Sequence, residues 1–167
     1  MTKVAIVTVD YDGHKDTSEL LESAKKLDIS NLEILWLVVD NGSDTSVKET
    51  VSKYPGVEWT QTGKNLGFAG GFNRGMKYAK EWGAEYVLII NNDTLLPDKN
   101  LLKNLLAVFE KNPKAGLVSP KIYFAPNFEF YKERYQKADE GKVIWYAGGS
   151  FDWDNIRSVH RGIDQVD

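Results

Sequence analysis

The strongest structural signal in this sequence is the stretch Glu85-Tyr-Val-Leu-Ile-Ile-Asn-Asn-Asp-Thr94. Five apolar residues run from Tyr86 to Ile90, too few for a helix and too uniform for a half-exposed strand. They predict a strand that is buried on both faces, as in a parallel sheet. Polar residues follow at once, at the strand end where open α/β sheets bind their ligands. The alternative is a polar turn that only ends the strand.

The rest of the chain alternates between strand-like and helix-like segments. Further strands are predicted at Lys3–Val9, Leu32–Val39, Val57–Thr62 and Leu117–Phe124. Helices are predicted at Asp16–Leu27, Thr45–Lys53, Lys64–Trp82 and Pro97–Asn112. The first of these helices is expected to begin with a capping box of Asp16 and Glu19. This β-α-β-α-β-α-β-α-β order predicts an α/β fold, a mostly parallel sheet with helices on both faces.

The pattern weakens beyond Ala125. The segment Phe128–Tyr135 is aromatic and charged, and we favour a helix that packs its aromatic rings over a lid that faces an acceptor or a membrane. A strand is expected at Lys142–Tyr146. The tail, Phe151–Asp167, shows no element that would close a domain. At 167 residues we expect one domain with a sizeable core.

Composition excludes several classes of function. A net charge of −3 and the lack of a dense Lys/Arg cluster argue against nucleic acid as a partner. The chain has no cysteine, so disulfides, thiolate metal sites and cysteine nucleophiles are excluded, which fits a cytoplasmic protein. The apolar run Val4–Val9 is too short for a signal peptide or a membrane span. We therefore expect no transmembrane segment, and any membrane contact would be peripheral, at the inner face.

Three polar clusters follow predicted strands, at Asp10–Lys15, Asp40–Asp44 and Asn91–Thr94. Because the carboxyl ends of parallel strands meet at one edge of a sheet, the clusters are expected to outline a single site. Asp40 could accept hydrogen bonds from a nucleobase or a ribose hydroxyl. It could equally form an Asx turn or cap the next helix.

Two further features suit a phosphorylated ligand. The segment Lys64–Gly75 places small residues at a helix start, where free N–H groups favour an anion, although it is neither a Walker loop nor a G-x-G-x-x-G fingerprint. Gly70 and Gly71 could instead allow close helix packing. Asp93 is an oxygen ligand suited to Mg²⁺ or Mn²⁺, with the phosphates of the ligand completing the site.

Three ordered motifs carry a family resemblance. They are Val38-Val-Asp-Asn-Gly-Ser-Asp44, Asn65-Leu-Gly-Phe-Ala-Gly-Gly-Phe-Asn-Arg-Gly75 and Leu88-Ile-Ile-Asn-Asn-Asp-Thr94. In order and spacing they resemble the nucleotide-sugar-binding half of family-two glycosyltransferases with the GT-A fold, most of all the rhamnosyltransferase-like branch. The resemblance covers roughly residues 3–150, with the donor-binding half at about residues 1–125.

The resemblance implies roles for individual residues. The nucleotide-sugar-binding residues would be Thr8, Asp10, Asp40, Lys64, Asn65, Gly67, Asn73, Asn91 and Asn92. Among them Asp40 would contact the nucleobase, and Asp93 would be the metal ligand. Asn91 replaces the first aspartate of the family's Asp-x-Asp motif, which leaves a less acidic site. Asp10 stands where asparagine is more usual.

The implied activity is sugar transfer with inversion, in polysaccharide biosynthesis. The donor would be a UDP-, dTDP- or GDP-linked sugar held with Mn²⁺ or Mg²⁺, and the acceptor a hydroxyl of a saccharide or a lipid-linked molecule. The family's catalytic base is an acidic residue in a later motif, which we expect beyond Asp167. The chain would then hold the donor-binding half and an incomplete acceptor part.

Two other classes of protein stay open. A sugar nucleotidyltransferase should carry a glycine-rich, arginine-containing loop after the first strand, and Asp10–Lys15 is not such a loop. A non-catalytic nucleotide- or sugar-binding module would bind the same ligands without turnover.

Overall fold

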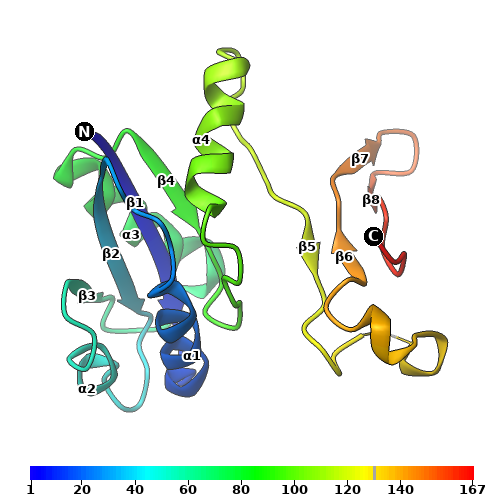
Figure 1. The fold of residues 1–167 in the computed structure, drawn as a ribbon. Coiled ribbons are helices and arrows are strands. Elements are labelled where there is room, and N and C mark those ends of the chain that lie inside the picture. The colour runs from blue at the N-terminus through cyan, green and yellow to red at the C-terminus, as the bar shows by residue number, and fades with distance from the viewer. Residues whose placement is uncertain (130) are drawn as a thin grey trace. The chain divides into compact units, whose positions relative to one another are not determined.

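The computed structural model describes residues 1–129 and 131–167, which form two compact units, Met1–Leu102 and Lys103–Asp167 (Figure 1). The first unit contains β1 (Thr2–Asp10), α1 (His14–Ala24), β2 (Leu32–Asp40), α2 (Lys48–Val51), β3 (Val57–Gln61), α3 (Gly67–Trp82) and β4 (Tyr86–Ile89). Helix α4 (Leu101–Lys111) begins at the end of the first unit. The second unit contains β5 (Ile122–Tyr123), the short 3₁₀ helices η1 (Lys132–Arg134) and η2 (Lys137–Asp139), β6 (Ile144–Tyr146), β7 (Gly149–Asp152) and β8 (Arg157–His160).

The first unit is built on a parallel sheet of four strands in the order β3-β2-β1-β4. Strands β1 and β2 are in register along their whole length, from Thr2 opposite Leu32 to Asp10 opposite Asp40. Their carboxyl ends are therefore level, and the loops that leave them start side by side. This confirms the predicted α/β fold.

Helices cover both faces of this sheet, as predicted. On one face, Phe72 and Ala79 of α3 pack on alternate residues of β1 and β2, which include Val7 and Leu37. On the other face, Leu21 of α1 packs with Val38 and with the α2 segment. Gly75 of α3 is needed for the first contact, because a Cβ there would collide with Val7. Helix α3 thus lies close to the sheet and brings its first turn to the sheet's carboxyl edge.

Strand β4 differs from its prediction, because it is not buried on both faces. It pairs only with β1 and lies at an edge of the sheet. Val87 and Ile89 are 39% and 46% exposed, while Tyr86 and Leu88 are half-buried. The reason is positional: the α3 contacts concentrate on β1 and β2, and the uniform apolar run could not reveal that this strand would be the outer one.

Helix α1 also begins differently from the prediction. It starts at His14, so Asp16 lies inside the first turn and no capping box with Glu19 forms. Gly13 precedes the helix, and its N–H donates to Asp10 Oδ1 over 3.3 Å. The Asp10 carboxylate at the end of β1 therefore fixes the residue before α1, and α1 has no side-chain cap.

The second unit corrects two further predictions. The expected strand Leu117–Phe124 shrinks to β5, which is antiparallel to β6 and does not join the parallel sheet. Leu117 is 95% exposed, and Pro120 removes a ladder N–H, so the segment cannot serve as a buried strand. The tail Phe151–Asp167, in which the sequence showed no element that would close a domain, contains β8 and the end of β7, which pair as a hairpin. The predicted strand at Lys142–Tyr146 is confirmed as β6.

The aromatic segment Phe128–Tyr135 contains residue 130, which lies outside the described residues. For the part that is described, our prediction of a packed helix is wrong, because only the three residues of η1 are helical. Phe128 is 76% exposed, so its ring does not pack on a sheet.

Candidate functional site

The three polar loops that follow β1, β2 and β4 meet at one edge of the sheet, as predicted. The Asn41 N–H donates to the Asp10 carbonyl over 2.8 Å, which joins the first two loops. Asn92 Nδ2 donates to the Gly13 carbonyl over 3.3 Å, which joins the third loop to the first. The convergence of these loops follows from the parallel order of the strands.

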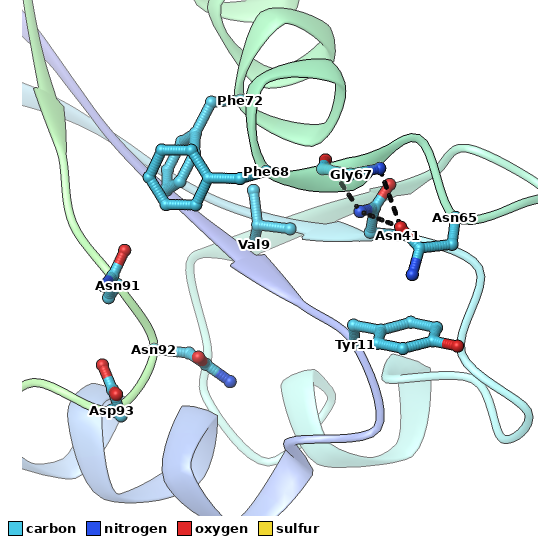
Figure 2. A pocket seen from close by; sticks show the side chains of 10 residues that line it. All are labelled: Val9, Tyr11, Asn41, Asn65, Gly67, Phe68, Phe72, Asn91, Asn92 and Asp93. Atoms are coloured by element: carbon cyan, nitrogen blue, oxygen red, sulfur yellow. Dashed lines mark hydrogen bonds between the residues drawn. The ribbon is translucent and has the colours of Figure 1, made fainter.

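A pocket of about 320 Å³ opens at this edge, on the α3 side of the sheet (Figure 2). Its lining residues are Val9, Tyr11, Asn41, Asn65, Gly67, Phe68, Phe72, Asn91, Asn92 and Asp93. Five of these, namely Asn65, Gly67, Asn91, Asn92 and Asp93, belong to the residues predicted to bind the nucleotide sugar and the metal. The lining therefore combines aromatic rings with amide and carboxylate groups.

Two asparagines fix the wall next to α3. Asn41 Nδ2 donates to Asn65 Oδ1 and to the Gly67 carbonyl over 3.3 and 3.2 Å. Asn41 Oδ1 in turn accepts from the Leu66 N–H, and Asn65 Oδ1 accepts from the Gly67 N–H over 2.8 Å. These bonds set the angle at which the chain enters α3.

Gly42 lies against the backbone that leads into the same wall. Its φ of +84° is a left-handed conformation that favours glycine, and a Cβ there would collide with the backbone between Lys64 and Asn65. Gly42 thus allows the loop after β2 to pack directly against the backbone of Lys64 and Asn65, just before α3.

The opposite wall is formed by Asn91, Asn92 and Asp93. Asn91 and Asp93 are exposed, and Figure 2 shows both side chains on the same side of the pocket. Asn92 is half-buried and anchors the loop, because its Nδ2 also donates to Thr17 Oγ1 over 3.2 Å. Gly13 makes room for it, since a Cβ at Gly13 would lie 2.5 Å from Asn92 Nδ2.

Thr8, Asp10 and Asp40 do not line the pocket. Side chains alternate across a strand, so Thr8 and Asp10 project to the α1 side of β1, whereas Val9 projects to the pocket side. Asp10 is fully buried and accepts hydrogen bonds from Thr17 Oγ1, His14 Nδ1, the Gly13 N–H and Ser43 Oγ. Asp10 therefore ties the loops after β1 and β2 to helix α1.

Asp40 shows the structural alternative that its sequence position had left open. Its Oδ1 accepts from the Ser43 N–H over 3.0 Å, and its Oδ2 accepts from the Val47 N–H over 3.2 Å. The side chain is 3% exposed. Asp40 shapes the turn before α2 in this structure, and its contact with a nucleobase stays a prediction.

His14 lies between the same loops. Its Nδ1 is 2.9 Å from Asp10 Oδ1, and its Nε2 is 2.9 Å from the Thr45 carbonyl, so both ring nitrogens face acceptors. Burial alone lowers the pKa of His14, but the Asp10 carboxylate, the Thr45 carbonyl and Asp40 together raise it above the ordinary value. The His14 ring thus joins the first two loops.

Lys64 and Asn73 are exposed and do not line the pocket. The Lys64 carbonyl accepts from Thr62 Oγ1 over 2.7 Å, which fixes the backbone just before Asn65. Arg74 of α3 points its Nη2 to Thr60 Oγ1 over 3.5 Å. The roles of Lys64 and Asn73 stay predictions.

Five lining residues were not singled out from the sequence, namely Val9, Tyr11, Asn41, Phe68 and Phe72. Phe68 and Phe72 stand one helical turn apart, and their ring centroids are 4.7 Å apart. Tyr11 directly follows β1 and is 54% exposed. Its place just beyond a strand end could have identified it, whereas the side of the sheet on which the pocket opens could not be known.

The residues present fit a divalent cation only in part. Asp93 supplies one exposed carboxylate and Asn91 an amide oxygen, which are the hard ligands that Mg²⁺ and Mn²⁺ prefer. Within residues 1–129 and 131–167 no group of three or more potential metal ligands occurs. A cation here would need oxygens from its ligand, as is usual for ions bound together with phosphates.

Helices long and apolar enough to cross a membrane are absent from the described part of the chain.

Comparisons with known proteins agree with this geometry. Galactofuranosyltransferase GlfT1 of Mycobacterium tuberculosis is 38% identical over 109 residues, which is 60% of this chain and 35% of the relative. The mannosyltransferase PcManGT of Pyrobaculum calidifontis, solved with GDP-Man and Mn²⁺, shares the fold with a TM-score of 0.58 and 20% identity, over 77% of this chain and 37% of that chain.

The third similar protein is S. aureus TarS 1–349, solved in complex with UDP-GlcNAc. It has a TM-score of 0.53 and 26% identity, over 72% of this chain and 37% of that chain. The chain spans only about a third of the length of each of these proteins. The family model for glycosyl transferase family 2 matches residues 5–165. The chain therefore belongs to glycosyl transferase family 2.

Proposed function

We propose that this chain binds a nucleoside-diphosphate sugar and a divalent cation in the pocket at the carboxyl edge of the sheet. The whole protein would transfer the sugar to an acceptor hydroxyl with inversion. The observation that carries the proposal is the pocket itself, because Asn65, Gly67 and residues 91–93, which come from two separate motifs of the sequence, line one cavity. We also propose that both units belong to one GT-A-type domain, with the donor-binding part at about residues 1–125.

The side of the pocket that contains Tyr11 suits the nucleoside. Tyr11 is an exposed ring on the pocket wall, and bases stack on such rings. The amides of Asn41 and Asn65 lie on the same wall and carry the donor and acceptor groups that read a base or a ribose.

The first turn of α3 suits the diphosphate. A helix leaves its first N–H groups without intrahelical partners, and its dipole favours negative charge at this end. Gly67 and Phe68 bring that turn to the pocket. Because the Gly67 N–H is already bonded to Asn65, the N–H groups after it are the ones that would meet a phosphate.

Asp93 would hold the cation, with Asn91 beside it. When bound, a divalent cation offsets the negative charge that develops on the departing diphosphate. Asn92 keeps Asp93 in place through its two bonds to the loop and helix after β1. The Mn²⁺ of the PcManGT structure supports a divalent cation as the cofactor.

The relatives indicate the class of donor and acceptor. TarS was solved with a UDP-sugar and GlfT1 is a galactofuranosyltransferase, so a hexosyl transfer from a UDP-linked sugar is our first expectation. A rhamnosyl transfer from a dTDP-linked sugar is the next. The acceptor would be a saccharide or a lipid-linked molecule, and a location at the inner face of a membrane stays a prediction.

A thermal-shift titration tests donor binding. The chain is unfolded in the presence of UDP-GlcNAc, UDP-galactose, dTDP-rhamnose or GDP-mannose, each with and without Mn²⁺. A ligand at about 100 times its dissociation constant should raise the free energy of unfolding by roughly 2.7 kcal/mol. Sugar transfer and donor hydrolysis are then measured with the best ligand, which separates an enzyme from a binding module.

Two variants test the metal assignment. Asp93→Asn should remove the part of the shift that depends on Mn²⁺, because the amide keeps the shape but loses the charge. Asp16→Asn is the matched control, since it removes an exposed carboxylate from α1 without touching the pocket. A chain that none of the four nucleotide sugars stabilises would refute the proposal, and an Asp93→Asn protein with full Mn²⁺ dependence would refute the cation site.

A further inference from the structure

The second unit contains a polar pocket of its own, with a volume of about 300 Å³. Its lining residues are Asn127, Glu129, Tyr135, Gln136, Lys137 and Glu140. All six belong to the second unit, so the pocket is complete without any residue of the parallel sheet. All six side chains carry a polar or charged group, which a polar ligand could bind.

Glu129 is the unusual residue in this pocket. Its side chain is only 7% exposed, and its Oε1 is buried without a hydrogen-bond partner among the described residues. An ionised carboxylate can only accept hydrogen bonds, and a buried acceptor without a donor is costly. Since Glu129 lines the cavity, a ligand there could supply the missing donor.

Tyr135 adds to the excess of acceptors. Its hydroxyl donates to the Asp164 carbonyl over 3.2 Å, so its proton is already used and its oxygen can only accept. Asp164 Oδ1, next to this bond, is also buried without a partner among the described residues. Burial, and then the negative charge of Asp164 and Glu129, raise the pKa of Tyr135, which keeps the phenol protonated.

The remaining lining groups supply donors. Lys137 contributes an ammonium group and Asn127 an amide NH₂. Gln136 and Asp139 form a reciprocal capping box, which fixes the turn that carries Gln136 and Lys137. The pocket thus offers both hydrogen-bond acceptors and hydrogen-bond donors, and the capping box holds the turn that carries Gln136 and Lys137.

The charges and the size of the pocket limit the classes of ligand that it can bind. Glu129 and Glu140 disfavour an anion such as a phosphate. A metal ion lacks ligands, since the described residues contain no group of three or more that could hold one. Hydroxyl groups both donate and accept, and a cavity at the lower end of the usual size range for ligand pockets has room for about one sugar unit.

We propose that this pocket binds a sugar unit of the saccharide acceptor, with a hydroxyl of that sugar donating to Glu129. The assignment of the sugar as an acceptor rests on the proposed function, whereas the saccharide class rests on the lining of the pocket. Glu129 binds and orients the sugar in this proposal. It is not assigned the role of catalytic base.

The test uses the full chain and the methyl glycosides of galactose, glucose, mannose, rhamnose and N-acetylglucosamine. Binding is measured by saturation-transfer NMR, and the dissociation constant of the best glycoside is then determined for each variant. Glu129→Gln should weaken binding at least tenfold, and Glu140→Gln about threefold. Glu133→Gln is the matched control, because it removes an exposed carboxylate of the same segment that does not line the pocket, and it should bind like the wild type.

Folding of the variants does not limit this test. Glu129→Gln removes a buried charge without a partner, so its melting temperature should equal or exceed that of the wild type. Glu140 is exposed, and its variant keeps the fold in any case. Absence of saturation transfer from all five glycosides would overturn the proposal, as would equal affinity of the wild type and Glu129→Gln.

The same samples separate this proposal from the proposed function. A normal shift with a nucleotide sugar, together with no glycoside binding, would reject only the acceptor pocket. Glycoside binding that depends on Glu129, without any shift by nucleotide sugars, would reject only the donor site and leave a saccharide-binding module.

Discussion

The two units of this chain are held together in different ways. Nearly all buried apolar side chains among the described residues belong to the first unit, and Val143 and Ile144 are those of the second. The first unit has a sheet of four strands, whereas β5–β6 and β7–β8 are pairs of two to four residues a strand. The proposed donor pocket is thus supported by a packed interior, while the polar pocket of the second unit is supported by turns and short antiparallel pairs.

The polar contacts follow the same division. In the first unit, buried Asp10 collects bonds from His14, Thr17 and the loop after β2. In the second, Asp167 accepts from Lys121 and Tyr123 at the surface. A polar group inside a protein is costly to leave unpaired, whereas one at the surface exchanges its partner for water. Substitutions should therefore cost far more in the first unit than in the second.

The largest difference in the free energy of unfolding between the two units should be seen when one leucine of each is replaced by alanine. Leu37 is fully buried between β1, β2 and α3, whereas Leu117 is 95% exposed. Leu37→Ala leaves a cavity and should lower the free energy of unfolding by about 2–5 kcal/mol. Leu117→Ala should change it by less than about 0.5 kcal/mol. Urea denaturation of both variants measures this, and a large loss for Leu117→Ala would show that the second unit has an interior that these residues do not reveal.

Two glycines sharpen the comparison within the first unit. Gly42 and Gly56 both have φ of +84°, but a Cβ would collide with the Lys64 backbone at Gly42 and would meet nothing at Gly56. Gly56→Ala should therefore cost only the left-handed backbone penalty of about 1–2 kcal/mol. Gly42→Ala should cost about 1–3 kcal/mol more, because the loop must move.

Nucleotide binding provides the second readout for the glycines. The displacement of the loop in Gly42→Ala also moves Asn65. The rise in melting temperature caused by a nucleotide sugar should therefore be smaller in Gly42→Ala and unchanged in Gly56→Ala. Equal losses of stability and binding in the two variants would contradict the close contact between the loop after β2 and the start of α3.

Thr17 tests the buried network itself. Its hydroxyl donates to Asp10 and accepts from Asn92 Nδ2 over 3.2 Å. Thr17→Val keeps the shape but leaves Asp10 Oδ2 without its donor and Asn92 Nδ2 with only the Gly13 carbonyl, so it should cost about 1–3 kcal/mol and weaken the Mn²⁺-dependent shift through Asn92. Thr17→Ser keeps the hydroxyl and should restore the Mn²⁺ effect. A Thr17→Val protein that is destabilised but has an unchanged Mn²⁺ response would show that Asn92 does not position Asp93.

Much of the first unit could be predicted because its signals are local. Apolar runs marked β1 and β2, and the alternating polarity of Val57–Thr62 marked β3. Helix α3 ends at Gly83, which adopts the left-handed conformation that favours glycine. The meeting of the three loops followed from the parallel order of strands. The exposure of Val87 and Ile89 could not be predicted, because it depends on which strand lies at the edge of the sheet.

The site was predicted less completely for a related reason. Family motifs led to Asn65, Gly67 and residues 91–93, which do line the pocket. They also led to Asp10 and Asp40, whose side chains point to the other face of the sheet and bind loops. A sequence shows that a carboxylate ends a strand, but the face that it occupies depends on register. In the second unit the strands have only two to four residues, which is too short for an alternation of polar and apolar residues to show in the sequence.

A smaller effect is expected from pH. The pKa of His14 is lower in the unfolded chain, near the ordinary value of 6.5, than in the folded one, so the folded state holds its proton more tightly. This contribution to stability is complete below pH 6.5 and is lost as the pH rises through the folded pKa. Denaturation between about pH 5 and 8 should show a loss of stability with rising pH that His14→Gln lacks. Parallel curves for the two proteins would contradict it.

The smallest effect is expected for the surface pair of the second unit. Lys121 and Asp167 have side chains that are 49% and 39% exposed, so water and salt screen their attraction. Lys121→Met should shift the urea midpoint only slightly at low salt and not at all at high salt, because the bond from Tyr123 to Asp167 remains. Measuring both midpoints together with those of Thr17→Val compares a surface network with a buried one. A loss for Lys121→Met as large as that for Thr17→Val, and unchanged by salt, would mean that the second unit is held by an interior polar network too, and the division between the two units would fall.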